Sequence, residues 1–228
     1  MEAPPHTFRH LDDELKALRT RVLEMGTLVE KQIADALTAL VERDSELAQS
    51  TIVADHVVNR MDVEIDDFCI RLLARYQPAA RDLRLITTGL KITTDLERMG
   101  DLAESIAKCA VELNAEPPLL PFIDIPRMAS IAQRMVRETL DAFVRDDTDL
   151  ALRVCESDDE IDALNDQLFR ILLTYMAENP LTVTRVIRLS LVAKCLERIG
   201  DHATNIAEMV VFMVKGKSIR HLSATPDP

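Results

Sequence analysis

The chain has 228 residues and a formal net charge of −12 at neutral pH, because 39 acidic residues outnumber 27 basic ones. This charge repels nucleic acid and anionic lipid surfaces over the chain as a whole. No apolar run approaches the roughly 20 residues of a membrane-spanning helix, and the first residues lack the basic and apolar regions of a signal peptide. We therefore expect a cytoplasmic protein that does not bind nucleic acid.

The composition also indicates the fold class. Apolar residues make up 47% of the chain and charged residues 29%, which is the balance of a folded protein. Only five glycines, no tryptophan and few alternating β-branched runs argue against a β-sheet. The four cysteines form no Cys-x-x-Cys pair, so we expect reduced structural thiols and neither a zinc knuckle nor a redox dithiol. The chain is predicted to be all-α.

Three long helices are predicted in the first half from apolar residues that recur at steps of three and four. The first runs from about residue 8 to residue 43. The second follows capping oxygens at 44–45 and ends near Tyr76. The third begins at Pro78, because the first position of a helix does not need the missing N–H, and extends to about Leu113.

The second half repeats this pattern beyond a stretch at 114–126 whose prolines cannot continue a helix. Helices are predicted over about 125–145 and 148–177, and a last one follows the Asn179-Pro180 break and ends near residue 215. Each helix with one apolar seam must bury that seam against neighbours.

We therefore predict two tandem, pseudo-symmetric three-helix bundles. Residues 1–114 form the first, 115–126 a proline-rich linker, 127–217 the second and 218–228 a mobile tail.

One charged hexapeptide occurs twice, as Leu-Glu-Arg-Met-Gly-Asp at 96–101 and Leu-Glu-Arg-Ile-Gly-Asp at 196–201. Residues four apart share a helix face, so Glu97 lies beside Asp101 and Glu197 lies beside Asp201. At about 6 Å and an effective dielectric of about 20, each pair repels by roughly 3 kcal/mol. A neighbouring arginine or a bound metal ion would offset this repulsion.

A second acidic pattern lies on the middle helix of each half. Asp55, Asn59 and Asp62 match Asp158, Asp162 and Asn165 in spacing. Heptad positions place these side chains and the repeated pairs on the outer side of each bundle. Since a tight turn makes the middle and last helices antiparallel neighbours, the two stripes can meet across one groove.

Two readings of these stripes are open. Oxygen ligands from two helices suit a hard cation, whereas charged helix faces are usually only solvated. We favour the cation because the duplication retains the motif. Gly100 and Gly200 support this, since glycine within a helix costs about 0.5 to 1 kcal/mol and implies a close helix approach or a ligand. His56 and His202 are expected to be helix-surface residues.

Three segments together resemble the PhoU family, the accessory proteins of the bacterial phosphate-specific transport system. They are Gln-Pro-Ala-Ala-Arg-Asp-Leu-Arg at 77–84, Asp-Leu-Glu-Arg-Met-Gly-Asp-Leu-Ala at 95–103 and Leu-Glu-Arg-Ile-Gly-Asp-His-Ala-Thr-Asn-Ile-Ala-Glu at 196–208. The resemblance covers nearly the whole chain and implies two three-helix bundles, as the seams predict independently.

The resemblance also implies metal sites, one set in each bundle. Matching positions carry the ligand role to eight residues: Asp55, Asn59, Glu97 and Asp101 in the first half, and Asp158, Asp162, Glu197 and Asp201 in the second. The implied ion is divalent or trivalent, such as Mg, Mn, Fe or Zn. Asn59 leaves the first set one charge short, so we expect the second to bind more tightly.

The role implied by the resemblance is regulatory. Such a protein damps the phosphate-starvation response when phosphate is plentiful, by contacting the transporter's ATP-binding subunit and the phosphate-sensing histidine kinase. It is expected to be a homodimer that approaches the membrane only through these partners. No nucleophile held by a base and no G-x-x-x-x-G-K-[ST] loop is present, so no catalytic residue is predicted.

Other readings are a metal-independent helical scaffold, a direct phosphate sensor and a di-metal carboxylate oxidase. The oxidase class carries Glu-x-x-His pairs that point into the bundle core, and this chain has no Glu-x-x-His. Phosphate would be repelled by the acidic residues unless a metal ion bridged it.

Overall fold

The computed structural model describes residues 5–119 and 125–219, with side chains from residue 10. Six α-helices and one short 3₁₀ turn occur in these ranges, and no strand does. The elements are α1 (Pro5–Val41), α2 (Ser45–Tyr76), α3 (Ala80–Asn114), α4 (Ile125–Arg145), α5 (Thr148–Glu178), η1 (Pro180–Thr182) and α6 (Val183–Lys215). The predicted all-α fold is confirmed.

The helix starts follow local capping chemistry in both halves. Asp44 accepts hydrogen bonds from the backbone N–H groups of the first turn of α2, and Asp147 does the same for α5. One detail of the prediction is wrong. Pro78 precedes α3, which begins at Ala80 after a left-handed turn at Gln77. The break at Asn179-Pro180 precedes the last helix as predicted, and Asn179 caps a 3₁₀ turn that Pro180 opens directly before α6.

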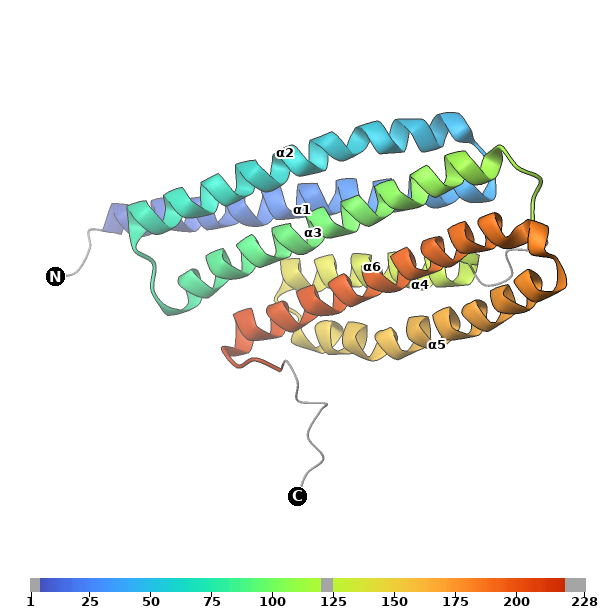
Figure 1. The fold of residues 1–228 in the computed structure, drawn as a ribbon. Coiled ribbons are helices and arrows are strands. Elements are labelled where there is room, and N and C mark those ends of the chain that lie inside the picture. The colour runs from blue at the N-terminus through green and yellow to red at the C-terminus, as the bar shows by residue number, and fades with distance from the viewer. Residues whose placement is uncertain (1–4, 120–124, 220–228) are drawn as a thin grey trace, which may run out of the picture.

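The six helices form two three-helix bundles that lie side by side (Figure 1). Helices α1, α2 and α3 pack on one another, as do α4, α5 and α6, and the bundles meet where α3 contacts α6 and α1 contacts α4. The tail predicted at 218–228 lies outside the described residues from residue 220 onward, and the predicted linker does so at 120–124.

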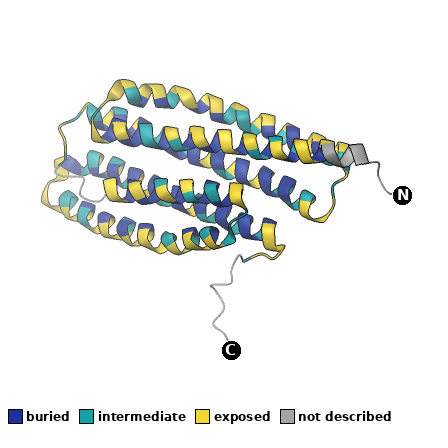
Figure 2. Cartoon of the chain, turned by 180° about the vertical axis from the view of Figure 1, so that it is seen from behind, coloured by how far each residue is buried: buried dark blue, intermediate teal, exposed yellow. Residues whose placement is uncertain are grey.

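Apolar seams form the core, as the inward stripes of dark blue in Figure 2 show. Along α6, eight apolar residues recur at steps of three and four, and all of them are buried: Leu189, Val192, Leu196, Ile199, Ala203, Ile206, Val210 and Met213. The buried apolar side chains of both bundles belong to one cluster. The helices at the bundle interface bury further residues beside this seam, such as Ala193, Ala207 and Val211 of α6. Replacing a buried leucine of the core by alanine would cost about 2–5 kcal/mol.

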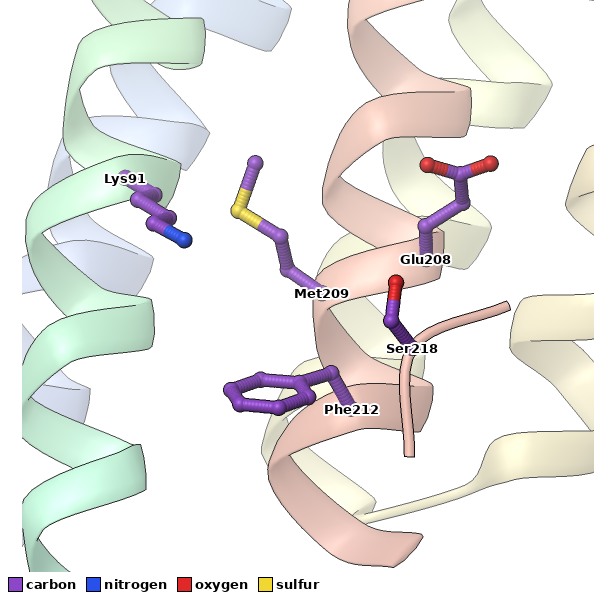
Figure 3. A pocket seen from close by; sticks show the side chains of 5 residues that line it. All are labelled: Lys91, Glu208, Met209, Phe212 and Ser218. Carbon is purple, nitrogen blue, oxygen red and sulfur yellow. The ribbon is translucent and has the colours of Figure 1, made fainter. Parts of the chain in front are cut away.

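Polar and apolar contacts fix α3 against α6. His202 Nδ1 lies 2.7 Å from Asp95 Oδ1, and Arg84 Nε donates to the Met213 carbonyl at 3.1 Å. Between these contacts Lys91 faces Met209 and Phe212 across a small pocket of about 150 Å³ (Figure 3).

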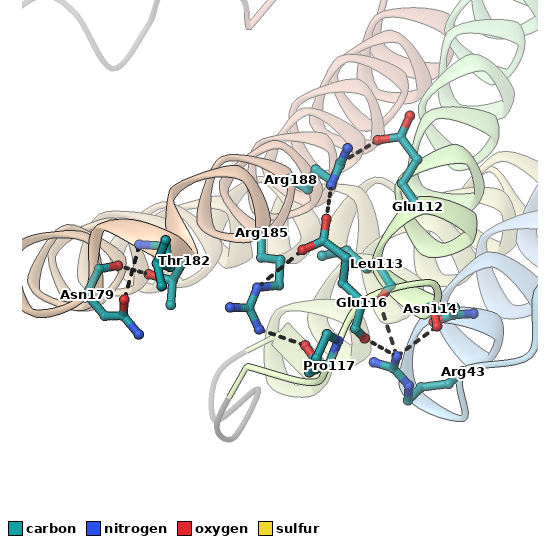
Figure 4. A network of polar contacts seen from close by, with 11 residues as sticks. Arg43, Glu112, Leu113, Asn114, Glu116, Pro117, Asn179, Thr182, Arg185 and Arg188 are labelled. Atoms are coloured by element: carbon teal, nitrogen blue, oxygen red, sulfur yellow. Dashed lines mark hydrogen bonds and ion pairs between the residues drawn. The ribbon is translucent and has the colours of Figure 1, made fainter.

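Ion pairs close the opposite end of the interface (Figure 4). Arg188 bonds to Glu112 and Glu116, and Arg185 donates to the Pro117 carbonyl at 2.8 Å. Arg43 donates to three carbonyls at the end of α3, those of Leu113, Asn114 and Glu116. These bonds satisfy carbonyls that a helix end leaves without partners.

Candidate metal-binding clusters

The first acidic cluster comprises Asp55, Asn59 and Asp62 on α2 with Glu97 and Asp101 on α3. Burial raises the pKa of Glu97, and the charges of Asp101, Asp62 and Asp55 raise it further, although Arg98 opposes them. Because charges act on a pKa in this way only over short distances, the four carboxylates must lie close together. The two predicted stripes of the first half do meet.

Asp62 was not among the predicted ligands. It lies three residues beyond Asn59 on the same stripe, which was the signal available in the sequence. Because it faces Glu97, it restores the carboxylate that Asn59 lacks.

Asp55 was expected to point outward, and this is wrong, because its side chain is only 5% exposed. Its Oδ1 accepts a hydrogen bond from Gln32 Nε2 at 3.1 Å and its Oδ2 accepts one from Asn59 Nδ2 at 2.7 Å. The heptad assignment considered only the apolar seam of α2. It could not show that Gln32 of α1 packs beside this seam and covers Asp55. A buried carboxylate here is tolerated because amide donors occupy both oxygens.

Gly100 and Gly200 allow the close helix approach that the sequence predicted. A Cβ atom on Gly100 would lie 3.2 Å from both Asp55 Oδ1 and Val58 Cγ1. A Cβ atom on Gly200 would lie 3.2 Å from Ile161 Cγ2. Only glycine lets the middle helix of each bundle come so near to the last.

The second acidic cluster comprises Asp158 and Asp162 on α5 with Glu197 and Asp201 on α6. Burial raises the pKa of Asp158 to about 6, and the charges of Asp201 and Asp162 add to this effect. Burial together with the charge of Glu197 also raises the pKa values of Asp162 and Asp201. All four predicted residues of this half are therefore assembled.

Single cations partly offset the repulsion in each cluster. Arg98 lies 3.4 Å from Glu97 and 3.1 Å from Asp101 in the first cluster. Lys194 donates to Glu197 at 2.5 Å in the second. Because these cations are more than half exposed, each pair contributes only about 0.2–1 kcal/mol.

Unpartnered oxygens test whether the clusters suit a cation. In the described residues, eight buried side-chain nitrogen or oxygen atoms have no hydrogen-bond partner, and six of them are oxygens at these clusters. The six oxygens belong to Gln32, Asn59 and Asp62 at the first cluster, and to Asp158, Glu197 and Thr204 at the second. Hard oxygen donors that lack hydrogen bonds are suitable ligands for a hard cation.

The candidate ligands are not close enough together to form a complete coordination shell. Within residues 5–119 and 125–219, no three His, Cys, Asp or Glu side chains are grouped so that they could hold a metal ion. A cation would therefore have to draw the carboxylates together as it binds. His56 is exposed, and His202 bonds to Asp95 of the other bundle, a contact that the sequence did not reveal.

None of the described helices is both long enough and apolar enough to cross a membrane.

Comparison with known proteins identifies the family. The family model described as "PhoU domain" matches twice, at residues 22–110 and 125–210. The phosphate-specific transport system accessory protein PhoU homolog of Pseudomonas aeruginosa is 44% identical over 222 residues, which cover 96% of this chain and 91% of that protein. The phosphate-specific transport system accessory protein PhoU of Escherichia coli is 37% identical over 95% of this chain and 90% of its own length.

Solved structures agree with this assignment. The crystal structure of PhoU from Pseudomonas aeruginosa superposes with a TM-score of 0.88 at 45% identity, covering 90% of this chain and 99% of that one. The PhoU structure from Streptococcus pneumoniae gives a TM-score of 0.86 at 29% identity over 92% of this chain and 99% of its own. The chain belongs to the PhoU family, and it is an accessory protein and not an enzyme.

Proposed function

We propose that this protein regulates phosphate uptake and damps phosphate-starvation signalling when phosphate is plentiful. The observation that carries the proposal is the 44% identity, over 96% of this chain, to a protein named for its accessory role in phosphate-specific transport. The proposed partners are the ATP-binding subunit of the phosphate transporter and the phosphate-sensing histidine kinase. We place the protein in the cytoplasm as a homodimer, where both partners are accessible.

A gene deletion with complementation tests this role. Cells that lack the protein should express phosphate-starvation genes despite ample phosphate, and a plasmid copy should restore repression. A reporter fused to a starvation promoter measures both effects. Normal repression in the deletion strain would contradict the proposal.

The two acidic clusters are proposed to hold divalent or trivalent cations. Asp158, Asp162, Glu197 and Asp201 would bind one ion, and Glu97, Asp101, Asp55 and Asp62 with the Asn59 carbonyl would bind the other. A bound cation would neutralise the repulsion that raises the pKa values of Asp158 and Asp201 and would hold α5 against α6. The unpartnered oxygens of both clusters support this assignment.

A metal-independent scaffold is the second candidate, and the lack of a preformed set of three ligands favours it. Elemental analysis of purified protein separates the two. Cations in the wild type that disappear in the Glu197→Ala/Asp201→Ala variant would support metal binding. Absence of cations from both proteins would favour the scaffold.

The acidic clusters are also proposed to contribute to the face that partners bind, because ligands on rigid helices present a fixed surface. A pull-down of the transporter subunit compares the wild type with the same double variant. Full binding by the variant would contradict this part of the proposal.

A further inference from the structure

The end of α2 carries a groove with arginines on its rim and apolar groups on its floor. A cavity of about 360 Å³ is lined by Phe68, Arg71, Leu72, Arg75 and Tyr76, and Glu14 of α1 lies at its edge. Phe68 and Leu72 are buried members of the core, so the floor is rigid. We call this surface the arginine groove and include Arg21, which packs on Phe68.

Aromatic rings hold the arginines in place. The Arg21 guanidinium lies 4.2 Å from the centre of the Phe68 ring, and that of Arg75 lies 5.2 Å from the centre of the Tyr76 ring. The Arg71 guanidinium also lies near Phe68, 5.9 Å from the centre of its ring. Stacking fixes the plane of a guanidinium while its edge N–H groups stay able to donate, which lowers the entropy lost when an anion binds.

Among the side chains that the structure describes, Arg21, Arg71 and Arg75 form no ion pair with a carboxylate, although the chain as a whole has 12 more acidic than basic residues. Glu14 is the one acid that lines the cavity within the described ranges. Three cations without an ion pair among the described side chains create a local positive potential that can attract an anion.

The duplication shows that this feature is specific to the first half. When Asp55 is aligned with Asp158, the positions of Phe68, Arg71 and Arg75 correspond to Ile171, Thr174 and Glu178. Neither an arginine nor an aromatic ring occupies these three positions of α5. The groove is therefore not a by-product of the shared bundle architecture.

We propose that the arginine groove binds an acidic segment of a protein partner, in which carboxylates flank an apolar side chain. Guanidinium edges match carboxylates in a bidentate manner, and the apolar floor accepts the side chain between them. Arginine and tyrosine around an apolar centre are also the residues that dominate binding energy at protein interfaces. The proposal goes beyond the regulatory function and stands without it, because it depends on the groove alone.

Two other ligands fit less well. A nucleotide base would need a free ring face, but Phe68 is 7% exposed and Arg21 covers it. An anionic membrane is a broad flat surface that would also have to approach the acidic residues around the groove, in a chain whose net charge is −12, whereas a short peptide contacts the groove alone.

Fluorescence anisotropy with two synthetic peptides tests the proposal. One labelled 12-residue peptide has Glu and Asp on both sides of a central Leu-Leu pair, and the other replaces these acids by Gln and Asn. The full-length protein should bind the acidic peptide in 50 mM NaCl, and binding should weaken at least fivefold in the Arg71→Gln/Arg75→Gln variant. The matched control, Arg153→Gln/Arg170→Gln on α5, should bind within twofold of the wild type.

Two further arms keep the test decisive. Ala74→Glu adds a charge at the exposed edge of the groove and should weaken binding as the arginine variant does; circular dichroism checks that each variant folds. Equal binding by the two double variants, equal binding of the neutral peptide, or no binding at all would overturn the proposal. Preferential binding to phosphatidylglycerol vesicles would assign the groove to a membrane and overturn it too.

Discussion

The two acidic clusters come from the same duplicated helix pair, yet they differ in how their buried aspartate is satisfied. In the first, amides of Gln32 and Asn59 donate to both oxygens of Asp55. In the second, Oδ1 of Asp158 is buried without a partner and the pKa of the carboxyl rises to about 6. The duplicated helices keep the arrangement of the carboxylates, and the second cluster has the less satisfied aspartate, which is why we propose that it binds a cation more tightly.

The largest expected effect is on cation affinity. Asp158→Asn with Glu197→Gln should weaken Mn²⁺ binding at the tighter site by about 100-fold or more, because two of the four carboxylates of that cluster become neutral amides. Asp55→Asn with Glu97→Gln should leave this tighter site nearly unchanged. Electron paramagnetic resonance of free Mn²⁺ during a titration measures both, and the reverse order of effects would refute the comparison.

The second largest expected effect is on stability in metal-free buffer, where substitutions in the two clusters should lower the free energy of unfolding by different amounts. Gln32→Met removes a donor from buried Asp55 and should lower the free energy of unfolding by about 1–3 kcal/mol. Thr204→Val in the second cluster should change it by less than about 0.5 kcal/mol, because the half-buried Thr204 hydroxyl approaches Asp158 without forming a hydrogen bond of good geometry. Urea denaturation with a chelator present gives both values, and equal losses would contradict the proposed difference.

The pH dependence of stability should reveal the raised pKa of Asp158. Its folded pKa of about 6 exceeds the ordinary 3.8, so the folded state prefers the protonated acid. Its favourable contribution is complete below about pH 4 and is lost as the pH rises through 6. The loss is about 1 kcal/mol after discounting for solvent screening.

The variant Asp158→Asn tests this dependence directly. Metal-free Asp158→Asn should show a smaller decline than the wild type, whereas Glu178→Gln at the end of α5 should retain the full decline. If the two variants and the wild type show the same pH profile, the pKa of Asp158 is not raised.

The smallest effect concerns the surface cation of the first cluster. Arg98→Gln should change stability by less than about 0.5 kcal/mol, since Arg98 is more than half exposed. It should strengthen cation binding at the first cluster a few-fold, because a competing charge is gone. Calorimetric titration of Mn²⁺ measures this change, and weaker binding would mean that Arg98 helps to form the site.

Much of this structure could be predicted from the sequence, because the relevant signals are local. Apolar spacing located the helices, and oxygen-bearing side chains such as Asp44 marked their starts. The repeated Glu-Arg-x-Gly-Asp segment identified the carboxylates on the last helix of each half, and the second acidic pattern identified those on the middle helices. Gly100 correctly indicated close helix packing.

Contacts between distant segments could not be predicted in this way. The burial of Asp55 depends on Gln32 of another helix, and the His202–Asp95 contact depends on which helices join the two bundles. The arginine groove likewise needs Arg21 of α1 to reach Phe68 of α2. The periodicity of a helix shows on which helix face a residue lies, but it does not show which residue of another helix covers it.

Anomalous diffraction from crystals grown with Mn²⁺ tests the central claim most directly. We predict a strong peak between α5 and α6, coordinated by Asp158 Oδ1 and Glu197 Oε2, and a weaker peak between α2 and α3. Peaks only at other surfaces, with these two oxygens unchanged, would contradict the account.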